Sequence, residues 1–344
     1  MNDDPDLLIT GTDQAETLRN YAQPTVRRGD GQRRIVESSD RRNEPFVDPR
    51  TGLRQDPRQG IRHEHQPSLA GAFPRKRNVF EPKYPCNSLL LRVGSVDTVG
   101  QLSELASESR QARDWDDLAT VDPLWAVLSA DSKRNGGWEL DEFFATGEAE
   151  VEHILATATE LGRPARREQA LDFGCGVGRL TRALAKRFGE TQGVDVSERM
   201  LEQARRLNED TPNLTFATAD EPPTGPFDLV VANLVLQHLP SRALARAYIN
   251  RLLKAARPDG LVVFQLPTNL TLAQRIQPRR RLYAALREHV TPERLNAAGL
   301  HPVRMLALPE ADVRATVDEA GATTARTEPA GDAGLRYYVH HRSP

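Results

Sequence analysis

The stretch Leu171-Asp172-Phe173-Gly174-Cys175-Gly176-Val177-Gly178-Arg179-Leu180-Thr181 limits the folds that the chain can adopt. A short apolar run, residues 170–173, leads into it, and leucine and alanine at helical spacing follow it. The pattern therefore predicts a strand, a glycine-rich turn and a helix. Gly174 and Gly176 allow backbone angles that other residues avoid, and they let a ligand approach the main chain. Ligands of open α/β sheets bind at strand ends of this kind.

The alternation of strand and helix continues on both sides of this turn. Apolar segments predict seven strands, at residues 170–173, 191–196, 214–217, 227–232, 261–266, 303–308 and 335–340. Helical spacing of apolar residues predicts helices over 118–128, 147–161, 242–256 and 292–298, among others. The repeated strand–helix order implies right-handed crossovers. We therefore expect an α/β fold with a doubly wound, mostly parallel, seven-stranded sheet.

Two common nucleotide-binding motifs do not fit the turn. The dinucleotide fingerprint Gly-x-Gly-x-x-Gly needs glycine at position 179, where this chain has Arg179. No Gly-Lys-Ser/Thr follows, as a phosphate-binding P-loop requires. The sequence therefore disfavours a nicotinamide oxidoreductase and excludes a P-loop nucleotidase.

Acidic residues end the second and third predicted strands. Asp195, in Gly193-Val194-Asp195-Val196-Ser197, follows Gly174 by 21 residues, and a carboxylate there can accept hydrogen bonds from both hydroxyls of a ribose. Asp220, after the third strand, can accept from an adenine amino group. Either residue could instead cap a helix or stabilise a turn. The spacing favours ribose for Asp195, while Asp220-Glu221-Pro222-Pro223 also has the composition of a turn.

Taken together, these motifs resemble those of class I S-adenosylmethionine-dependent methyltransferases. The matching segments, in the order of that family's strands, are residues 171–178, 193–195, 227–230 and 252–260. The resemblance covers about residues 115–344 and implies a Rossmann-like fold with S-adenosylmethionine as cofactor. It implies methyl transfer by in-line displacement, most simply to an oxygen or nitrogen of a small-molecule acceptor.

The resemblance also implies which residues bind the cofactor. Those that match the motifs are Asp172, Gly174, Cys175, Gly176, Gly178, Asp195, Val196, Asp220 and Asn233. The segment from Trp115 to Gly147 is similar to the lead-in of a bacterial small-molecule subgroup, in which Phe144 and Gly147 would cover the cofactor. Cys175 lies inside the glycine turn, where a small buried wall residue is expected rather than a nucleophile.

The best candidate for a general base is His238, in the segment 233–240 after the fourth predicted strand. In the resembling family this loop faces the cofactor's methyl group, and a histidine can take a hydroxyl proton near neutral pH. In the alternative interpretation His238 only lines the pocket or caps the turn before Pro240. No metal site is expected.

A basic run, Arg279-Arg280-Arg281, lies between the fifth predicted strand and the last helices, where a substrate lid would sit. A solvated surface patch is the simpler interpretation. If the run is functional, it favours an acidic or phosphorylated acceptor.

The composition divides the 344 residues unevenly. Residues 1–80 are rich in Arg, Asp, Gln, Gly and Pro and lack sustained periodicity, so we expect a disordered or irregular extension with little share in the core. Within it we expect His63 and His65 to be a solvated pair and not metal ligands, since no cysteine or third histidine is near in the sequence. Residues 81–114 are expected to be a linker or short helical lead-in, with a strand over 88–93, and 115–344 to form the catalytic domain.

Charge and cysteine content exclude several classes of protein. The formal net charge is −2, so no global field attracts nucleic acid or an anionic membrane. Two cysteines make no disulfide scaffold, the acidic start lacks the features of a signal peptide, and no apolar stretch has the length of a membrane helix. We expect a cytoplasmic protein, and the excess of arginine over lysine is associated with GC-rich bacterial genomes.

Two alternatives stay open for the function. The first is a methyltransferase acting on protein or nucleic acid. Against it, Asn233 is followed by Leu-Val-Leu, not by the Pro-Pro-aromatic segment that clamps a flipped amine, and no basic stripe is present. The second is a catalytically inactive scaffold, which would have no reason to keep the glycine turn together with Asp195. The acceptor and the oligomeric state do not follow from the sequence.

Overall fold

The computed structural model describes residues 98–220, 223, 225–331 and 334–342, with side chains from residue 109 onward. Several predictions from the sequence concern residues outside this range. They are the irregular extension over 1–80, the solvated pair His63 and His65, and the strand over 88–93.

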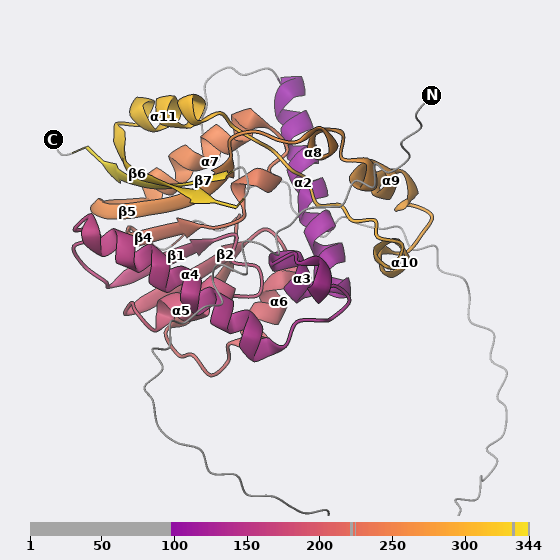
Figure 1. The fold of residues 1–344 in the computed structure, drawn as a ribbon, viewed down its shortest axis with the longest axis horizontal. Helices are drawn as coiled ribbons and strands as arrows, with labels where there is room; N and C mark the ends of the chain where they lie inside the picture. Colours follow the sequence, from indigo (N-terminus) through magenta and orange to yellow (C-terminus); the bar gives the residue numbers. More distant parts are fainter. Residues whose placement is uncertain (1–97, 221–222, 224, 332–333, 343–344) are drawn as a thin grey trace, which may run out of the picture. The chain divides into compact units, whose positions relative to one another are not determined.

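A seven-stranded sheet forms the centre of the described chain (Figure 1). Its strands are β1 (Gln169–Phe173), β2 (Glu190–Asp195), β3 (Leu214–Thr218), β4 (Phe227–Ala232), β5 (Ala256–Pro267), β6 (Ala322–Ala330) and β7 (Gly334–His341). The order is β3-β2-β1-β4-β5-β7-β6, and β7 alone runs opposite to the other six strands. The doubly wound, mostly parallel sheet that the sequence predicts is thus confirmed.

Helices cover both faces of the sheet, and a further group lies to one side (Figure 1). They are α2 (Thr98–Val121), α3 (Pro123–Val127), α4 (Leu140–Glu160), α5 (Arg179–Ala185), α6 (Glu198–Leu207), α7 (Arg242–Ala255), α8 (Leu272–Ile276), α9 (Pro278–Leu286), α10 (Pro292–Ala297) and α11 (Glu310–Glu319). Short 3-10 turns occur at Asp131–Lys133 and Leu236–His238. Within the described ranges, none of the helices combines the length and apolarity that crossing a bilayer demands.

The strands bury both of their faces, as a sheet between two helical layers requires. In β4, Val230 and Ala232 join the cluster that includes α7 and α11, whereas Leu229 and Val231 join the cluster that includes α4 and α5. The same alternation holds in β5, where Phe264 faces the first cluster. Because successive side chains of a strand point to opposite faces of the sheet, one apolar strand contributes to both cores.

One predicted strand is wrong. Residues 303–308 form no strand; the edge strand is β6 (Ala322–Ala330) instead. The backbone of this run bonds to the 3-10 turn after β4 and to the end of β5: the N–H of Leu306 donates to the Gln237 carbonyl at 2.7 Å and that of Leu308 to the Pro267 carbonyl at 3.0 Å. The run is apolar because Leu306 and Leu308 pack in the core cluster that includes α7 and α11. The edge strand β6 escaped prediction because its sequence is largely polar.

The helix predicted over 118–128 is interrupted at Asp122. Its carboxylate accepts from the Trp125 backbone N–H at 3.3 Å, and Pro123 begins the new helix α3. A cap residue followed by proline is a strong signal for a helix start. Helix α7 ends at Ala255, close to the expected end, but β5 begins directly afterwards at Ala256.

Helix α2 begins well before residue 115, where the sequence predicts the catalytic domain to start. The carboxylate of Asp116, near its C-terminal end, accepts from the Ser197 hydroxyl at 2.6 Å and from the Arg199 backbone N–H at 3.3 Å. Ser197 is itself the N-cap of α6. The lead-in helix is therefore fixed to the loop that follows β2.

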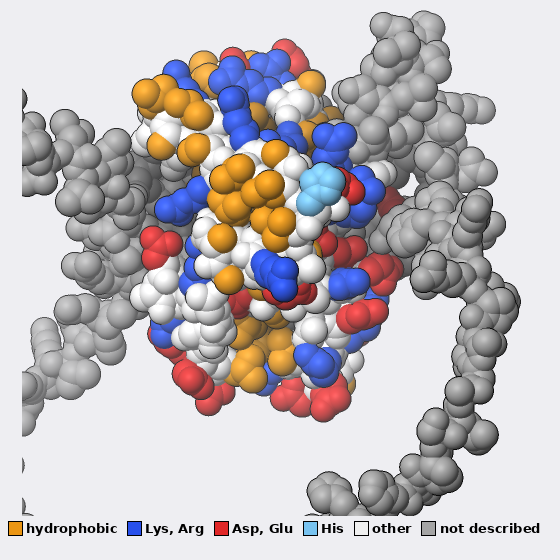
Figure 2. Space-filling model, turned by 90° about the vertical axis from the view of Figure 1, so that its right-hand side faces the viewer, with side chains coloured by type: hydrophobic (Ala, Val, Ile, Leu, Met, Phe, Trp, Pro, Cys, Tyr) orange, Lys and Arg blue, Asp and Glu red, His pale blue; other side chains and the backbone are white. Residues whose placement is uncertain are grey.

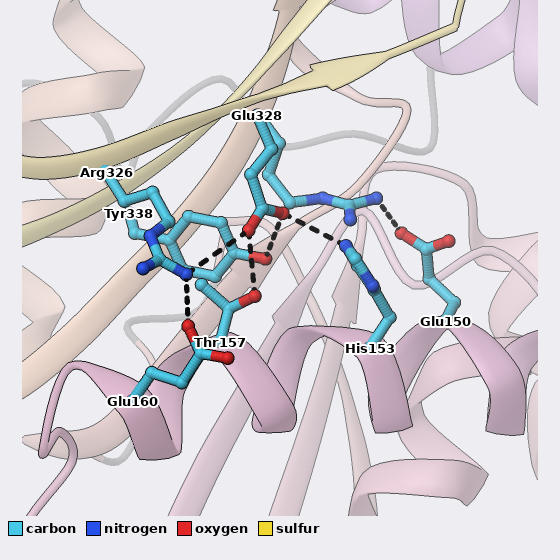
Figure 3. Close-up of polar contacts among 8 residues, drawn as sticks. Glu150, His153, Thr157, Glu160, Arg326, Glu328 and Tyr338 are labelled. Carbon is cyan, nitrogen blue, oxygen red and sulfur yellow. Dashed lines mark hydrogen bonds and ion pairs between the residues drawn. The ribbon is translucent and has the colours of Figure 1, made fainter.

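A partly buried polar cluster joins α4 to the antiparallel strands β6 and β7 (Figure 3). The Glu328 carboxylate accepts from the Thr157 hydroxyl at 2.8 Å and the Tyr338 hydroxyl at 3.0 Å, and it contacts the His153 ring at 3.0 Å. Burial alone would raise the pKa of Glu328, but these three hydrogen bonds outweigh it and lower the pKa. The cluster anchors α4, the helix that packs against α5 behind the glycine turn.

Candidate active site

A pocket opens at the carboxyl ends of the central strands, where the strand order reverses between β1 and β4. It holds about 970 Å³, counting the space open to solvent at its mouth. The sequence-predicted residues that line it are Asp172, Gly174, Cys175, Gly176, Asp195, Val196, Asn233 and His238. Four elements of the chain thus bring together, at the switch point of the sheet, residues that lie far apart in the sequence.

The glycine turn between β1 and α5 needs glycine for both conformation and space. Gly174 and Gly176 have φ angles of +74° and +54°. A Cβ added at Gly174 would overlap the side chain of Val235, and one at Gly176 would overlap the side chain of Val127. The main chain at the turn therefore lies directly against the walls of the pocket.

Asp195 closes one side of this turn. One of its oxygens accepts from the Gly176 backbone N–H at 2.8 Å and the other from the Ser197 backbone N–H at 2.9 Å. Burial raises the pKa of Asp195, while the backbone hydrogen bonds oppose that rise. Each carboxylate oxygen retains a further lone pair, so the group can still accept two hydrogen bonds from a ligand.

Asp172 lies at the base of the pocket. It is 3% exposed, and it accepts from the Thr181 hydroxyl at 2.7 Å. Burial raises its pKa to about 6; the Thr181 hydrogen bond and the charge of Arg179 oppose the rise, and Asp195 adds to it. A ligand cation beside this carboxyl would favour its ionised form.

Cys175 is a buried wall of the same pocket. Its side chain is 3% exposed, with Sγ 3.7 Å from the Gly176 carbonyl oxygen. Burial raises the pKa of the thiol well above its usual value, with the charges of Asp195 and Asp172 in support. A protonated thiol is a poor nucleophile. The environment of Cys175 therefore favours a role in the wall of the pocket over a role as nucleophile.

His238 lies in the 3-10 turn after β4 and reaches the pocket. Its Nδ1 is 2.6 Å from the Arg304 carbonyl oxygen, and its ring meets that of Trp115 edge to face at 5.3 Å. Because a carbonyl oxygen only accepts, Nδ1 carries the hydrogen and Nε2 presents its lone pair. Burial lowers the pKa of His238 to about 4, against the effect of the Arg304 bond, so the ring is neutral at pH 7.

The lead-in helices form a wall that the sequence did not assign to the site. Gln111 and Trp115 from α2, one turn apart, line the pocket together with Ala126 and Val127 from α3. Only the bulky Trp115 stood out in the sequence, within the lead-in segment. Which face of a helix turns to a pocket depends on tertiary packing, and nothing in this segment indicates it.

The loop after β4 contributes a strained residue beside Asn233. Leu234 has a φ angle of +57° and lines the pocket with Val235. A left-handed conformation is costly for leucine and is found where the surrounding structure imposes it, often at functional sites. Tyr248 from α7 completes this side of the pocket.

Four predicted cofactor-binding residues do not line the pocket. Gly178 starts α5 with a φ angle of +86° and packs against Asn208 and Phe216. Asp220 is exposed, and its neighbour Ala219 lines the pocket in its place.

The other two are on α4. Phe144 packs edge to face on Phe143 at 5.6 Å with the Arg182 guanidinium over its ring, and a Cβ at Gly147 would overlap the Arg179 backbone. Gly147 thus permits close contact of α4 with α5.

The comparison with protein families agrees with this geometry. Residues 170–260, from β1 into β5, match the family model described as a methyltransferase domain. Over these residues the chain is similar to a methyltransferase domain. The resemblance to class I S-adenosylmethionine-dependent methyltransferases, first seen in the sequence motifs, is thereby confirmed.

Relatives of this methyltransferase domain include curated bacterial enzymes. The trans-aconitate 2-methyltransferase of Methylobacterium radiotolerans is 40% identical over 124 residues, 34% of this chain and 43% of the relative. That of Methylobacterium nodulans is 35% identical over 175 residues, 49% of this chain and 62% of the relative. The chain therefore spans about half the length of the curated relatives it matches.

Among solved structures, the magnesium protoporphyrin IX methyltransferase of Synechocystis PCC 6803 with bound SAH matches 68% of this chain and 100% of its own, at 22% identity and a TM-score of 0.46.

Proposed function

We propose that this protein binds S-adenosylmethionine in the pocket at the glycine turn and transfers its methyl group to an oxygen or nitrogen of a small-molecule acceptor. The observation that carries the proposal is Asp195, which holds the Gly176 backbone N–H and keeps two acceptor positions at the edge of the pocket. The catalytic domain predicted over 115–344 is proposed to include the rest of α2. A cytoplasmic location stays a prediction.

The residues present fit this cofactor. Gly174 and Gly176 line the pocket and carry no side chain that would keep a ligand away from their backbone. Asp195 is positioned to accept hydrogen bonds from the two hydroxyls of a ribose. A cationic group beside Asp172, whose pKa is raised to about 6, would further favour the ionised form of this carboxyl. When bound, S-adenosylmethionine supplies a methyl group activated by the positive charge on its sulfur.

The protein's own contribution is to hold two reactants in line and to exclude water. Trp115 and Val127 from the lead-in helices close the pocket on the side away from the sheet. Alignment of this kind accounts for a large part of such rate enhancements, and no covalent enzyme intermediate is needed. An acceptor hydroxyl or amine would pass its proton to the free Nε2 of His238. An acceptor that is already ionised needs no base, and His238 would then only position it.

The curated relatives suggest the first acceptor to test. Their names give trans-aconitate, a carboxylic acid, as the compound methylated. We propose a carboxylic acid as the leading acceptor class.

Radiolabelled methyl transfer tests this proposal. The full chain is incubated with methyl-labelled S-adenosylmethionine and, in separate reactions, trans-aconitate, other small carboxylic acids, a hydroxylated metabolite mixture, a peptide library and RNA. Label in a small-molecule fraction, lost in Asp195→Ala, supports the proposal. Label only in peptide or RNA would replace it by the first alternative, and cofactor binding without transfer to any fraction would favour the inactive scaffold.

A further inference from the structure

A second cavity lies on the other side of α2 from the cofactor pocket. Its lining includes four arginines, Arg110 and Arg113 from α2 and Arg280 and Arg287 from the α9 region. It holds about 770 Å³, counting space open to solvent, and it shares no lining residue with the cofactor pocket. Helix α2 separates the two, since Gln111 faces the cofactor pocket while its neighbour Arg110 faces this arginine cavity.

The charges around the arginine cavity are not balanced. Arg287 is neutralised, because its guanidinium pairs with Asp114 and, at 2.8 Å, with Asp117. Tyr283 donates its hydroxyl to Asp117 at 3.0 Å and so completes this internal group. The other carboxylate of the lining, Glu288, is exposed.

Three arginines remain without such a partner. Among the described residues, no carboxylate lies within 4.0 Å of Arg110, Arg113 or Arg280. The Nε atom of Arg280 is buried and has no hydrogen-bond partner in the described chain. Burial lowers the pKa of Arg304, with the charges of Arg280 and Arg110 adding to the effect, so several cations lie close together here.

Like charges held near one another at the rim of a cavity repel, and an anion relieves the repulsion. A guanidinium presents a planar fork of donors that matches the oxygens of a carboxylate or phosphate. Arg110 and Arg113 come from one helix and Arg280 from another, so the donors converge from two sides.

We propose that the arginine cavity binds a small molecule through a carboxylate or phosphate group, at a site separate from the cofactor pocket. Figure 2 shows the side of the molecule on which α9 and α10 lie, with Lys and Arg side chains in separate groups around a hydrophobic patch. Leu272 and Ile276 on α8 and Leu282 on α9 are exposed apolar residues beside the basic run. A mixed surface of this kind suits a small anion and lacks the continuous basic stripe that nucleic acid requires.

The structure also separates two members of the basic run. Arg280 lines the arginine cavity, whereas Arg281, the next residue on the same helix, is exposed and does not. Arg281→Gln therefore removes the same charge from the same helix without changing the lining. It is the matched control for Arg280→Gln.

Calorimetric titration of the full chain at constant ionic strength tests the site, with sodium phosphate and sodium citrate as probes in separate experiments and sodium chloride as the balancing salt. We expect saturable binding of at least one probe. Arg280→Gln and, independently, the exposed Arg113→Gln should weaken it about tenfold, because each removes a charge-assisted pair. Arg281→Gln should change the affinity for the probe less than about twofold.

Each outcome bears on the proposal. Binding of phosphate that depends on Arg280 assigns a phosphate ligand, and binding of citrate alone assigns a carboxylate. Absence of saturable binding of both probes, or equal weakening by Arg281→Gln, would overturn the site. If Arg280→Gln loses its folded circular-dichroism spectrum, Arg113→Gln decides. Cofactor titration of the same proteins is read separately, since the two pockets share no residue, and it reports on the methyltransferase function alone.

Discussion

Gly176→Ala probes the contact between the glycine turn and α3. The new Cβ would overlap the side chain of Val127, far inside the normal carbon–carbon separation of about 3.5–4.0 Å. Two costs add: roughly 1–2 kcal/mol for alanine in a left-handed conformation, at a φ angle of +54° here, and about 1–3 kcal/mol for overpacking. The variant should therefore lose roughly 2–5 kcal/mol of unfolding free energy.

A matched control separates the two costs. Gly162 has a φ angle of +65°, but no atom lies within 4 Å of an added Cβ. Gly162→Ala should therefore show only the conformational cost, roughly 1–2 kcal/mol. The difference between the two variants measures the overlap with Val127.

A double-mutant cycle then tests the partner. Val127→Ala removes the atoms that the new Cβ would meet, so Gly176→Ala should cost about 1–3 kcal/mol less in that background. Urea unfolding followed by tryptophan fluorescence is a suitable assay, because Trp125 lies on α3 itself. Equal losses in the Gly176 and Gly162 variants, or no rescue by Val127→Ala, would refute the packing of α3 on the turn.

Three further predictions concern the pocket. Asp195→Ala should weaken S-adenosylmethionine binding about 100-fold or more, because two charge-assisted hydrogen bonds are lost. As a control, substitution of its exposed neighbour, Glu198→Ala, should change the affinity less than about twofold in the same titration. The pKa of Asp172 is about 6 in the folded protein and about 3.8 in the unfolded chain. The free energy of unfolding should therefore fall as pH rises between these two values, by at most about 1.4 kcal/mol per pH unit. Subtracting the pH profile of Asp172→Asn from that of the unchanged protein should isolate this slope. With a hydroxyl or amine acceptor, His238→Ala should lower turnover about 100-fold with cofactor affinity unchanged, and unaltered turnover would remove His238 from the mechanism.

The sequence predicts the parts of the site that local pattern controls. The glycine turn and Asp195 follow strands whose burial on both faces leaves an unbroken apolar run, so the strand ends are easy to find. Gly174 and Gly178 look alike in the sequence. The structure distinguishes them, because Gly174 faces the pocket while Gly178 packs against Asn208 and Phe216.

Long-range packing determines the parts that the sequence misses. The apolar pattern over 303–308 predicts a strand, but the N–H groups of Leu306 and Leu308 bond to the 3-10 turn after β4 and to the end of β5 instead of to a neighbouring strand along its length. The lead-in wall depends on how α2 docks, through Asp116 on Ser197, far along the chain. Arg280 and Arg281 are identical residues next to each other, and only the placement of α9 separates their surroundings.

The most direct test of the account is calorimetric titration of the full chain with S-adenosylmethionine, with NAD titrated in parallel. We predict saturable binding of one S-adenosylmethionine per chain, weakened by Asp195→Ala, and no saturable binding of NAD. Absence of S-adenosylmethionine binding, or equally strong binding of NAD, would contradict it.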